Sequence, residues 1–324
     1  MRWRVWILSF SITLLFAGAG LSWNNTGHEV VAGIAWDNMT PAARHKAIAL
    51  LEAAPPDACL RDLFPHDARP LAARQREFFM RAATWPDRVR PDKTINDTRP
   101  CTRFHRGDWH FFDRFWQGVS GETGSDAPKD RPDVKVAAVN AVERLHLFRP
   151  LVACGTAACG TPLDERATTL AWILHLVGDI HQPLHTSSRM IVVDGKEQPD
   201  QGGNLFKLSH EEKPPSLHGF WDGILDASIP RQAQETDIAY FDRVIGIITH
   251  DHPRATMTAH LHSGDFDEWS REGFATTKNV AYPKSLKEGE MPDAAYRQMV
   301  FKVADEAIAL AGYRLADVLN KMLQ

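Results

Sequence analysis

The segment 172–185 constrains the fold and the chemistry of this chain more than any other part of the sequence. Residues 163–182 have the periodicity of a long helix, which the proline after it would end. His175 and Asp179 are four residues apart, so they share one face of this otherwise apolar helix. A buried carboxylate without a cationic partner is costly, and a divalent metal would provide that partner. The segment therefore predicts a helix that carries metal ligands, and His185, just past the proline, can turn toward a second metal.

Residues of the same types recur at other places in the chain. His218 and Asp222 repeat the spacing of four in another predicted helix, His110 lies in an aromatic Trp-His-Phe-Phe run, and Asp87 follows Trp-Pro. Each of these alone is a weak indication, because a single histidine is more often a half-exposed surface residue than a ligand. Three ligand-type side chains within positions 175–185 are not explained in that way, so we interpret them as metal ligands.

Helical signals dominate the chain as a whole. With 44% hydrophobic and 24% charged residues, its composition is that of a soluble globular protein and excludes a disordered chain, a collagen or a coiled coil. Thr26 starts a predicted capping box, and Thr40 precedes a proline at the first position of another helix. Further helices are predicted over 70–84, 133–148, 238–249, 265–281 and 293–323.

Little β structure is expected. Residues 190–193 and 204–208 flank a turn-rich stretch with Asp194-Gly195, which predicts one short β-hairpin. Residues 118–133 form the most loop-like stretch, and it is too short to separate two domains. We therefore predict a mainly α fold, with residues 23–324 as a single helical domain.

The first 22 residues are interpreted as a secretory signal peptide. Arginines at positions 2 and 4 precede an apolar run, and Gly20-Leu21-Ser22 places small residues before a predicted cleavage site. The alternative is an uncleaved membrane anchor, but the run is shorter than the ~20 apolar residues that a spanning helix needs. Cleavage leaves Trp23 as the new N-terminus, and we expect a protein exported to a periplasm or the cell exterior, with no membrane association.

The four cysteines suggest two disulfide bonds in an exported chain. Cys154 and Cys159 enclose a short loop, and that pairing would leave Cys59 with Cys101. Three pairings are possible, and the sequence alone does not choose among them. No Cys-x-x-Cys motif occurs, so a thiolate zinc ribbon is unsupported.

The order of these motifs resembles the type I zinc-dependent nucleases, the S-one/P-one family, which is distantly related to zinc phospholipase C. That family carries a Trp at the mature N-terminus, then His, Trp-x-Asp, Trp-His-Phe, a His-x-x-x-Asp pair with a later His, and a second His-x-x-x-Asp pair. The matching residues here are, in chain order, Trp23, His28, Asp87, His110, His175, Asp179, His185, His218 and Asp222. The Gly-Gly-Asn triplet at 202–204 also matches.

The resemblance implies three zinc ions in one cleft. One zinc would be held by Asp87, His110, His175 and Asp179. A second would be held by the amine and carbonyl of Trp23, by His28 and by Asp179 as a bridge, and the third by His185, His218 and Asp222. A free α-amine has a pKa of ~7.7, low enough for metal binding near neutrality. Imidazole and carboxylate without thiolate are ligands that suit zinc.

The resemblance also implies the reaction. Zinc lowers the pKa of bound water to about 7, so hydroxide is available without a separate base. Hydroxide between the two zinc ions bridged by Asp179, one of them also held by Asp87, would attack phosphorus and release 5′-phosphorylated products. The matching positions for substrate contacts are Arg90 for phosphate, Phe111 and Asp113 for the base, and Asn204 as a further substrate-binding residue. Surface charge and core packing are the competing interpretations of Arg90 and Phe111.

The substrate expected from this resemblance is single-stranded DNA or RNA and nucleotides, cleaved by a monomer. The net charge is −4, and signal cleavage makes the chain more acidic, which does not fit a duplex-binding module. A zinc phospholipase C is the closest alternative enzyme, although that family has Glu in place of Asp222 and lacks the Gly-Gly-Asn triplet. A non-catalytic zinc protein is the alternative from another class, but structural zinc sites are closed and usually rich in cysteine.

Overall fold

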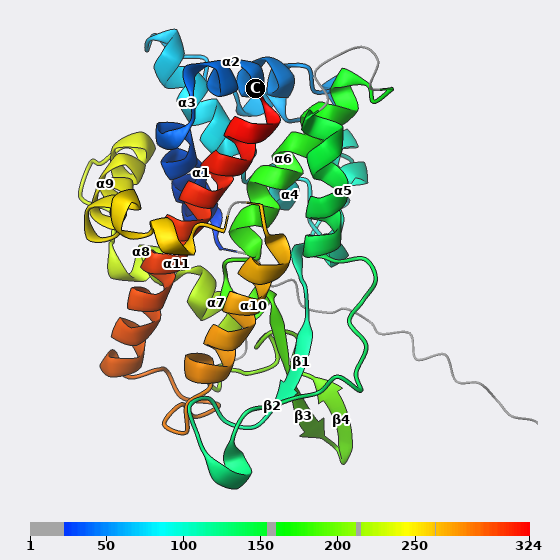
Figure 1. Ribbon diagram of the computed structural model, residues 1–324, viewed down its shortest axis with the longest axis vertical. Coiled ribbons are helices and arrows are strands. Elements are labelled where there is room, and N and C mark those ends of the chain that lie inside the picture. Colours follow the sequence, from blue (N-terminus) through cyan, green and yellow to red (C-terminus); the bar gives the residue numbers. More distant parts are fainter. Residues whose placement is uncertain (1–22, 154–159, 212–214, 263) are drawn as a thin grey trace, which may run out of the picture.

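The computed structural model describes residues 23–153, 160–211, 215–262 and 264–324, and most of these residues lie in helices (Figure 1). The long helices are, in chain order, α1 (Asn25–Asn38), α2 (Pro41–Glu52), α3 (Leu71–Ala82), α5 (Ala141–Ala153), α6 (Leu163–Asp179), α9 (Asp237–Asp251), α10 (Phe266–Thr276) and α11 (Ala294–Met322). The described residues also form the short helices α4 (Trp85–Arg88), α7 (Leu217–Asp222) and α8 (Ile224–Ser228). The predicted mainly α fold is confirmed. Within these ranges, no helix has the length and apolar character needed to cross a bilayer.

Most predicted helices are found within a few residues of their predicted bounds. α2 begins as expected, because the Thr40 hydroxyl accepts a hydrogen bond from the Ala43 N–H (3.2 Å) and proline occupies the first helical position. α3, α9, α10 and α11 match the remaining predictions, and the predicted helix 265–281 ends in a π-helical turn, Thr277–Ala281.

The start of α1 differs from the predicted capping box. Asn24 is the N-cap, and its side-chain oxygen accepts a hydrogen bond from the Gly27 N–H (3.2 Å). Thr26 lies inside the first turn, where its hydroxyl donates to Asp226. The cap prediction at Thr26 is therefore wrong, because asparagine is a strong cap and stands two residues earlier.

The helix predicted at 133–148 begins later and extends further, since α5 runs from Ala141 to Ala153. The Asn140 side chain accepts a hydrogen bond from the Glu143 N–H (2.9 Å) and donates to the Ala137 carbonyl (2.8 Å). Asparagine in this arrangement caps a helix and favours a turn before it, so the chain ahead of Asn140 does not continue the helix.

α6 ends at Asp179, three residues before the predicted end. A proline at position 183 clashes with the carbonyl four residues earlier, which belongs to Asp179. The chain instead tightens into a turn in which the Gln182 N–H donates to the Asp179 carbonyl (2.9 Å). Asp179 consequently stands at the helix end, where the chain changes direction.

The strands form one small mixed sheet, which is more β structure than the single hairpin predicted. Its order is β2 (Lys129–Asp130), β1 (Arg114–Gln117), β3 (Ser187–Val193) and β4 (Lys196–Pro199). β1 pairs in parallel with β3, and Arg114 lies opposite Ser187. The parallel pairing joins segments far apart in sequence, which is why local patterns did not predict it. The loop predicted at 118–133 contains the two-residue strand β2.

The predicted hairpin is confirmed in part. Its first strand and its turn are confirmed, with positive φ angles at Asp194 (51°) and Gly195 (75°) that suit a tight two-residue turn. The second strand is β4, which follows this turn at once, so the strand predicted at 204–208 is wrong. The first of these residues instead lie in a turn, in which the Asn204 N–H donates to the Gln201 carbonyl (3.1 Å) and the Leu205 N–H donates to the Asp200 carbonyl (3.1 Å).

The core is built around α1 and α6. The side chains of α1 are buried from Thr26 to Trp36, and those of α6 are buried from Ala167 to Asp179. Helices buried all round lie at the centre of a fold. Figure 1 shows the sheet at one end of the molecule and α2 at the other, with the start of α1 and the end of α6 between them.

One disulfide lies within the described residues and joins Cys59 to Cys101, with their Cα atoms 5.7 Å apart. This bond selects one pairing among those that the sequence left open. Cys154 and Cys159 lie outside the described residues, as does the predicted signal peptide.

Candidate metal centre

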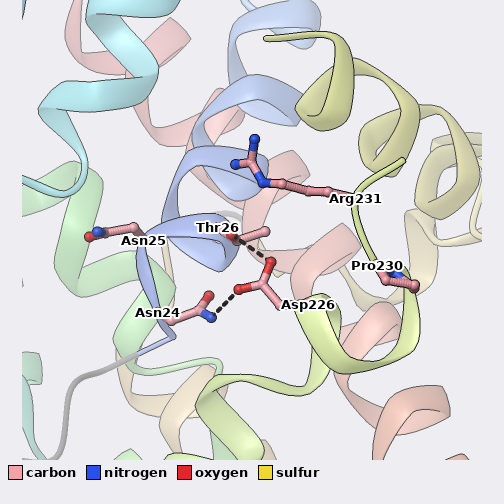
Figure 2. Close-up of a pocket in the computed structure, with 6 residues that line it drawn as sticks. All are labelled: Asn24, Asn25, Thr26, Asp226, Pro230 and Arg231. Carbon is pink, nitrogen blue, oxygen red and sulfur yellow. Dashed lines mark hydrogen bonds between the residues drawn. The ribbon is translucent and has the colours of Figure 1, made fainter. Parts of the chain in front are cut away.

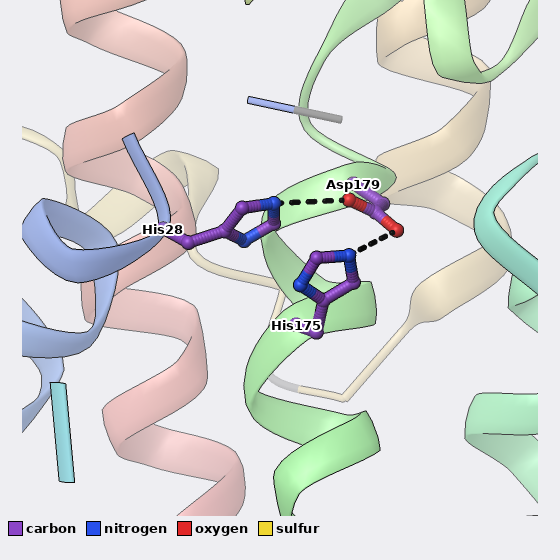
Figure 3. A group of neighbouring side chains, drawn as sticks. All are labelled: His28, His175 and Asp179. Carbon is purple, nitrogen blue, oxygen red and sulfur yellow. Dashed lines mark ion pairs between the residues drawn. The ribbon is translucent and has the colours of Figure 1, made fainter. Parts of the chain in front are cut away.

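Three side chains meet where α1 begins and α6 ends, and we call them the His28 group: His28, His175 and Asp179 (Figure 3). His28 lies in the first turn of α1, and its Nε2 is 3.4 Å from one carboxylate oxygen of Asp179. His175 Nε2 is 3.4 Å from the other oxygen. The two imidazole rings stack with their centroids 3.8 Å apart. All three side chains are fully buried, so their polar atoms face one another rather than water.

Gly178 permits this approach and was not singled out in the sequence. A Cβ atom at this position would lie 2.8 Å from His28 Nδ1 and 3.0 Å from the neighbouring ring carbon. Any side chain at position 178 would therefore push His28 away from α6. The available signal was a glycine inside a long apolar helix, which costs helix stability and usually has a packing or functional reason.

A second group, the Asp87 group, consists of Asp87, His110 and His175. Asp87 comes from α4, and His110 comes from the 3-10 turn Gly107–His110. His110 Nδ1 is 2.9 Å from His175 Nε2 and 3.1 Å from Asp179, while Asp87 approaches His175 Nε2 to 3.9 Å. His175 thus belongs to both groups and joins them.

The third group, the Asp222 group, consists of His185, His218 and Asp222. The Nε2 atoms of His185 and His218 are 3.0 Å apart, and His218 Nε2 is 3.5 Å from the Asp222 carboxylate. Gln182 holds the other carboxylate oxygen, because its side-chain amide donates to Asp222 Oδ1 (2.7 Å). Gln182 was not predicted as part of the site, because its only signal in the sequence is that it is a polar residue between predicted ligands.

Backbone carbonyls orient three of these imidazoles. The Nδ1 atoms of His175, His185 and His218 lie 2.7 Å, 2.8 Å and 2.7 Å from the carbonyls of Ala83, His110 and Gly202. A carbonyl only accepts hydrogen bonds, so each Nδ1 carries the proton and donates. Each Nε2 therefore turns a lone pair into the group, as a metal-ligating histidine does.

The electrostatics of the groups suit metal ligands. Burial holds the pKa of His175 well below its usual range and lowers the pKa of His185 to about 4, so both rings are neutral near pH 7. Burial raises the pKa of Asp222 well above its usual range. Burial acts in the same direction on Asp179, but the imidazoles of His175 and His110 outweigh it and lower the pKa of that carboxyl.

The buried atoms in the groups that make no hydrogen bond among the described residues include His110 Nε2 and Asp222 Oδ2. Buried polar atoms are nearly always hydrogen-bonded in native proteins, and a bound cation satisfies them equally well. Neutral imidazoles and carboxylates in each group, without a thiolate, form a donor set that fits zinc. The residues present therefore fit the metal that the sequence implies.

Comparison with known proteins connects this centre to a family. The model of the S1/P1 nuclease family matches residues 23–324. The chain belongs to the S1/P1 nuclease family. It is 23% identical to Endonuclease 2 of Arabidopsis thaliana over 98% of this chain and 97% of that protein. It is 22% identical to Nuclease S1 of Aspergillus oryzae over 65% of this chain and 56% of that protein.

The protein is accordingly a nuclease, a hydrolase that acts on nucleic acid, and members of this family depend in general on zinc. Arg90, the predicted phosphate contact, lies beside the centre, because one of its guanidinium nitrogens is 3.7 Å from an Asp87 carboxylate oxygen. Phe111 also lies beside it, stacked on the His185 ring with the centroids 4.7 Å apart. Both side chains remain partly exposed.

Asp113 and Asn204, the two other predicted substrate residues, differ in the atoms that they have available for hydrogen bonds. Burial, with a smaller contribution from Asp200, raises the pKa of Asp113 to about 7, and its Oδ1 has no hydrogen-bond partner among the described residues. Asn204 donates its side-chain amide to the Gln201 carbonyl (2.9 Å), so any contact of Asn204 with substrate would use its amide oxygen.

Trp23 and His181 lie close to the centre of the nuclease but outside the three groups. Trp23 is fully buried immediately before α1, and a Cβ on Gly27 would lie 2.6 Å from the Trp23 Cβ. His181 donates from Nδ1 to the Val177 carbonyl (2.7 Å), and its Nε2 lies 2.9 Å from the Arg314 guanidinium. Both ring nitrogens of His181 thus make contacts outside the three groups.

Proposed function

We propose that this nuclease hydrolyses single-stranded DNA and RNA with three zinc ions and leaves 5′-phosphorylated products. The observation that carries the proposal is the meeting of three His/Asp groups, two of which share His175, at the junction of α1, α4, α6 and α7. In each group the possible ligand atoms lie within 4.8 Å of one another. A cluster of several cations suits a polyanionic substrate better than it suits a structural role.

The proposed ligands follow the three groups. Asp87, His110, His175 and Asp179 would hold one zinc. His28, Asp179 and the amine and carbonyl of Trp23 would hold a second, which makes Asp179 a bridge between the two. His185, His218 and Asp222 would hold the third. The bridging role is supported by the two oxygens of Asp179, which face His28 on one side and His175 with His110 on the other.

The protein's own contribution to the reaction is orientation and charge. Zinc at these positions would supply an activated water and positive charge for a phosphodiester group. Asp87 and Asp179 are the proposed catalytic carboxylates, because they set the spacing of the His28 and Asp87 groups. The backbone carbonyls that fix the imidazoles keep the ligand geometry in place throughout the reaction.

Substrate contacts are proposed for four side chains at the edge of the centre. The exposed part of Arg90 would bind a phosphate oxygen, as an arginine beside anionic groups commonly does. The Phe111 ring would stack on a base that is free of pairing, which favours single-stranded substrates. Asp113, with its pKa raised to about 7, would form a hydrogen bond with that base, together with the amide oxygen of Asn204.

The proposal includes export and maturation. Residues 1–22 would act as a signal peptide, and its removal would expose the Trp23 amine of a single-domain nuclease, residues 23–324. We also propose that the mature protein works as a monomer in a periplasm or outside the cell, and that it removes phosphate from 3′-nucleotides.

A single set of assays on the chain that begins at Trp23 tests these points. Metal analysis should give three zinc ions per chain. Single-stranded DNA and RNA should be cleaved faster than duplex DNA, with 5′-phosphate ends, and adenosine 3′-monophosphate should lose its phosphate. Cleavage of phosphatidylcholine vesicles but not of DNA would favour a phospholipase C. Bound zinc without either activity would favour a zinc-binding protein.

A further inference from the structure

The Asp226 carboxylate in α8 collects hydrogen bonds from three other side chains. Its Oδ2 accepts from the Asn24 amide (2.6 Å), and its Oδ1 accepts from the Thr26 hydroxyl (2.8 Å) and the Tyr240 hydroxyl (2.7 Å). Figure 2 shows Asp226 between the start of α1 and the chain that follows α8. Tyr240 is fully buried, so this carboxylate links the segment before α1 to the core.

The segment held in this way directly follows Trp23. Asn24 also caps α1, and its backbone N–H donates to the carbonyl of Asp222 (3.2 Å). Asp226 stands four residues after Asp222, so two successive turns of the chain hold the same short segment. Chain ends are poorly ordered unless other contacts hold them, and an ordered end loses less entropy when it binds a metal.

We propose that Asp226 is a positioning residue that fixes Asn24 and Thr26 and thereby holds the amine and carbonyl of Trp23 in place for zinc. The inference rests on the proposed function, in which Trp23 is a ligand. Asp226 itself belongs to none of the three groups of possible metal ligands. Its effect passes through the backbone of Asn24, which is the residue bonded to Trp23.

The surroundings of Asp226 favour this role over a separate ligand site. A surface pocket of about 420 Å³ lies beside it, lined by Asn24, Asn25, Thr26, Asp226, Pro230 and Arg231 (Figure 2). The cation in this pocket is already engaged, because the Arg231 guanidinium pairs with Asp237 (2.5 Å) and lies over the Tyr240 ring. Asn24 and Thr26 both donate to Asp226, so the carboxylate of the pocket is engaged as well.

The test compares zinc binding by chains that begin at Trp23. Wild type, Asp226→Ala, Tyr240→Phe and Thr26→Val are equilibrated with zinc buffers, and bound zinc is counted at each free concentration. Asp237→Ala is the matched control, since it removes an acid beside the same pocket that does not contact Asn24 or Thr26. For Asp226→Ala we expect one of three zinc ions to bind about 10- to 100-fold more weakly, the range for residues that orient metal ligands. Tyr240→Phe and Thr26→Val should show smaller shifts of the same zinc, and Asp237→Ala should show none.

The outcomes separate this inference from the proposal on which it rests. Three zinc ions with wild-type affinity in Asp226→Ala would overturn the positioning role alone. An equal shift in Asp237→Ala would overturn it as well, because general loss of charge would then be the cause. If Asp226→Ala does not fold, unchanged zinc binding in both Tyr240→Phe and Thr26→Val overturns the inference. If wild type binds no more zinc than a chain with an added residue before Trp23, the Trp23 ligand fails and the inference fails with it.

Discussion

The sequence contains the pattern His-x-x-x-Asp twice, and the two copies have different surroundings. In α6, His175 and Asp179 are 3.4 Å apart, and in α7, His218 and Asp222 are 3.5 Å apart. Each pair is thus built in the same way from one helical turn. Asp179, however, lies at the end of a 17-residue helix in the core, whereas Asp222 ends a helix of six residues.

The neighbours of each carboxylate make the difference. Asp179 faces imidazoles from α1, α6 and the turn before β1, and these lower its pKa well below the usual range although burial opposes them. Asp222 faces one imidazole and the Gln182 amide, so burial raises its pKa well above the usual range. Local spacing therefore creates a pair of possible ligands, and long-range packing decides whether the carboxylate joins one group or two.

The largest effect is expected for Asp179→Asn. An amide cannot carry the negative charge that the two joined groups share, so at least one zinc should be lost, and activity on single-stranded DNA should fall by more than about 10³-fold. Zinc counting and initial rates check this outcome. A variant with full zinc and near-normal turnover would show that Asp179 does not bridge two zinc ions and that it differs from Asp222 only in its surroundings.

An added residue before Trp23 should have the next largest effect. This effect should be confined to the zinc sites that include Asp179 and should not reach the site of Asp222. The nitrogen of Trp23 would then be an amide, which binds zinc poorly, so the zinc proposed for Trp23 and His28 should be missing. Activity should be low and should rise when a protease exposes Trp23. Equal zinc and equal activity with and without the added residue would remove the N-terminal ligand from the proposal.

Gln182→Leu should affect only the zinc site of the Asp222 group. The variant removes the amide that holds Asp222 Oδ1 while it keeps a side chain of similar size. We expect about 10- to 100-fold weaker binding of the third zinc, with the zinc ions near Asp179 retained. Competition with a chelator, followed by metal analysis, measures this. If all zinc ions bind more weakly by the same factor, the sites of Asp179 and Asp222 are not independent.

Arg90→Ala should have the smallest effect and should leave the zinc sites of Asp179 and Asp222 intact. Arg90 lies beside Asp87 but is partly exposed, so it is placed to bind phosphate rather than metal. We expect full zinc, little change in kcat and a KM for single-stranded DNA raised about tenfold, the scale of one hydrogen bond to a charged group. Unchanged kinetics would make Arg90 an ordinary surface charge.

The sequence predicted features that depend on nearby residues. The α6 pair, the α2 cap and the hairpin turn follow from spacings of a few positions, and the structure has them. It did not predict the parallel pairing of β1 with β3, or Gln182 as a partner of Asp222, because these contacts join residues distant in sequence. The cap predicted at Thr26 was wrong because Asn24, a stronger cap, stands two residues earlier. The strand predicted at 204–208 was wrong because the two-residue turn after β3 leads the chain directly into β4, which pairs with β3 instead.

The glycine at position 178 limits how far this protein can be made more stable. Glycine in a helix interior destabilises it by about 1 kcal/mol relative to alanine, so an engineer seeking thermostability would replace it first. Here an added methyl group would lie 2.8 Å from His28. The most obvious stabilising change in α6 would thus displace a proposed zinc ligand, and heat resistance must be sought in helices that carry none.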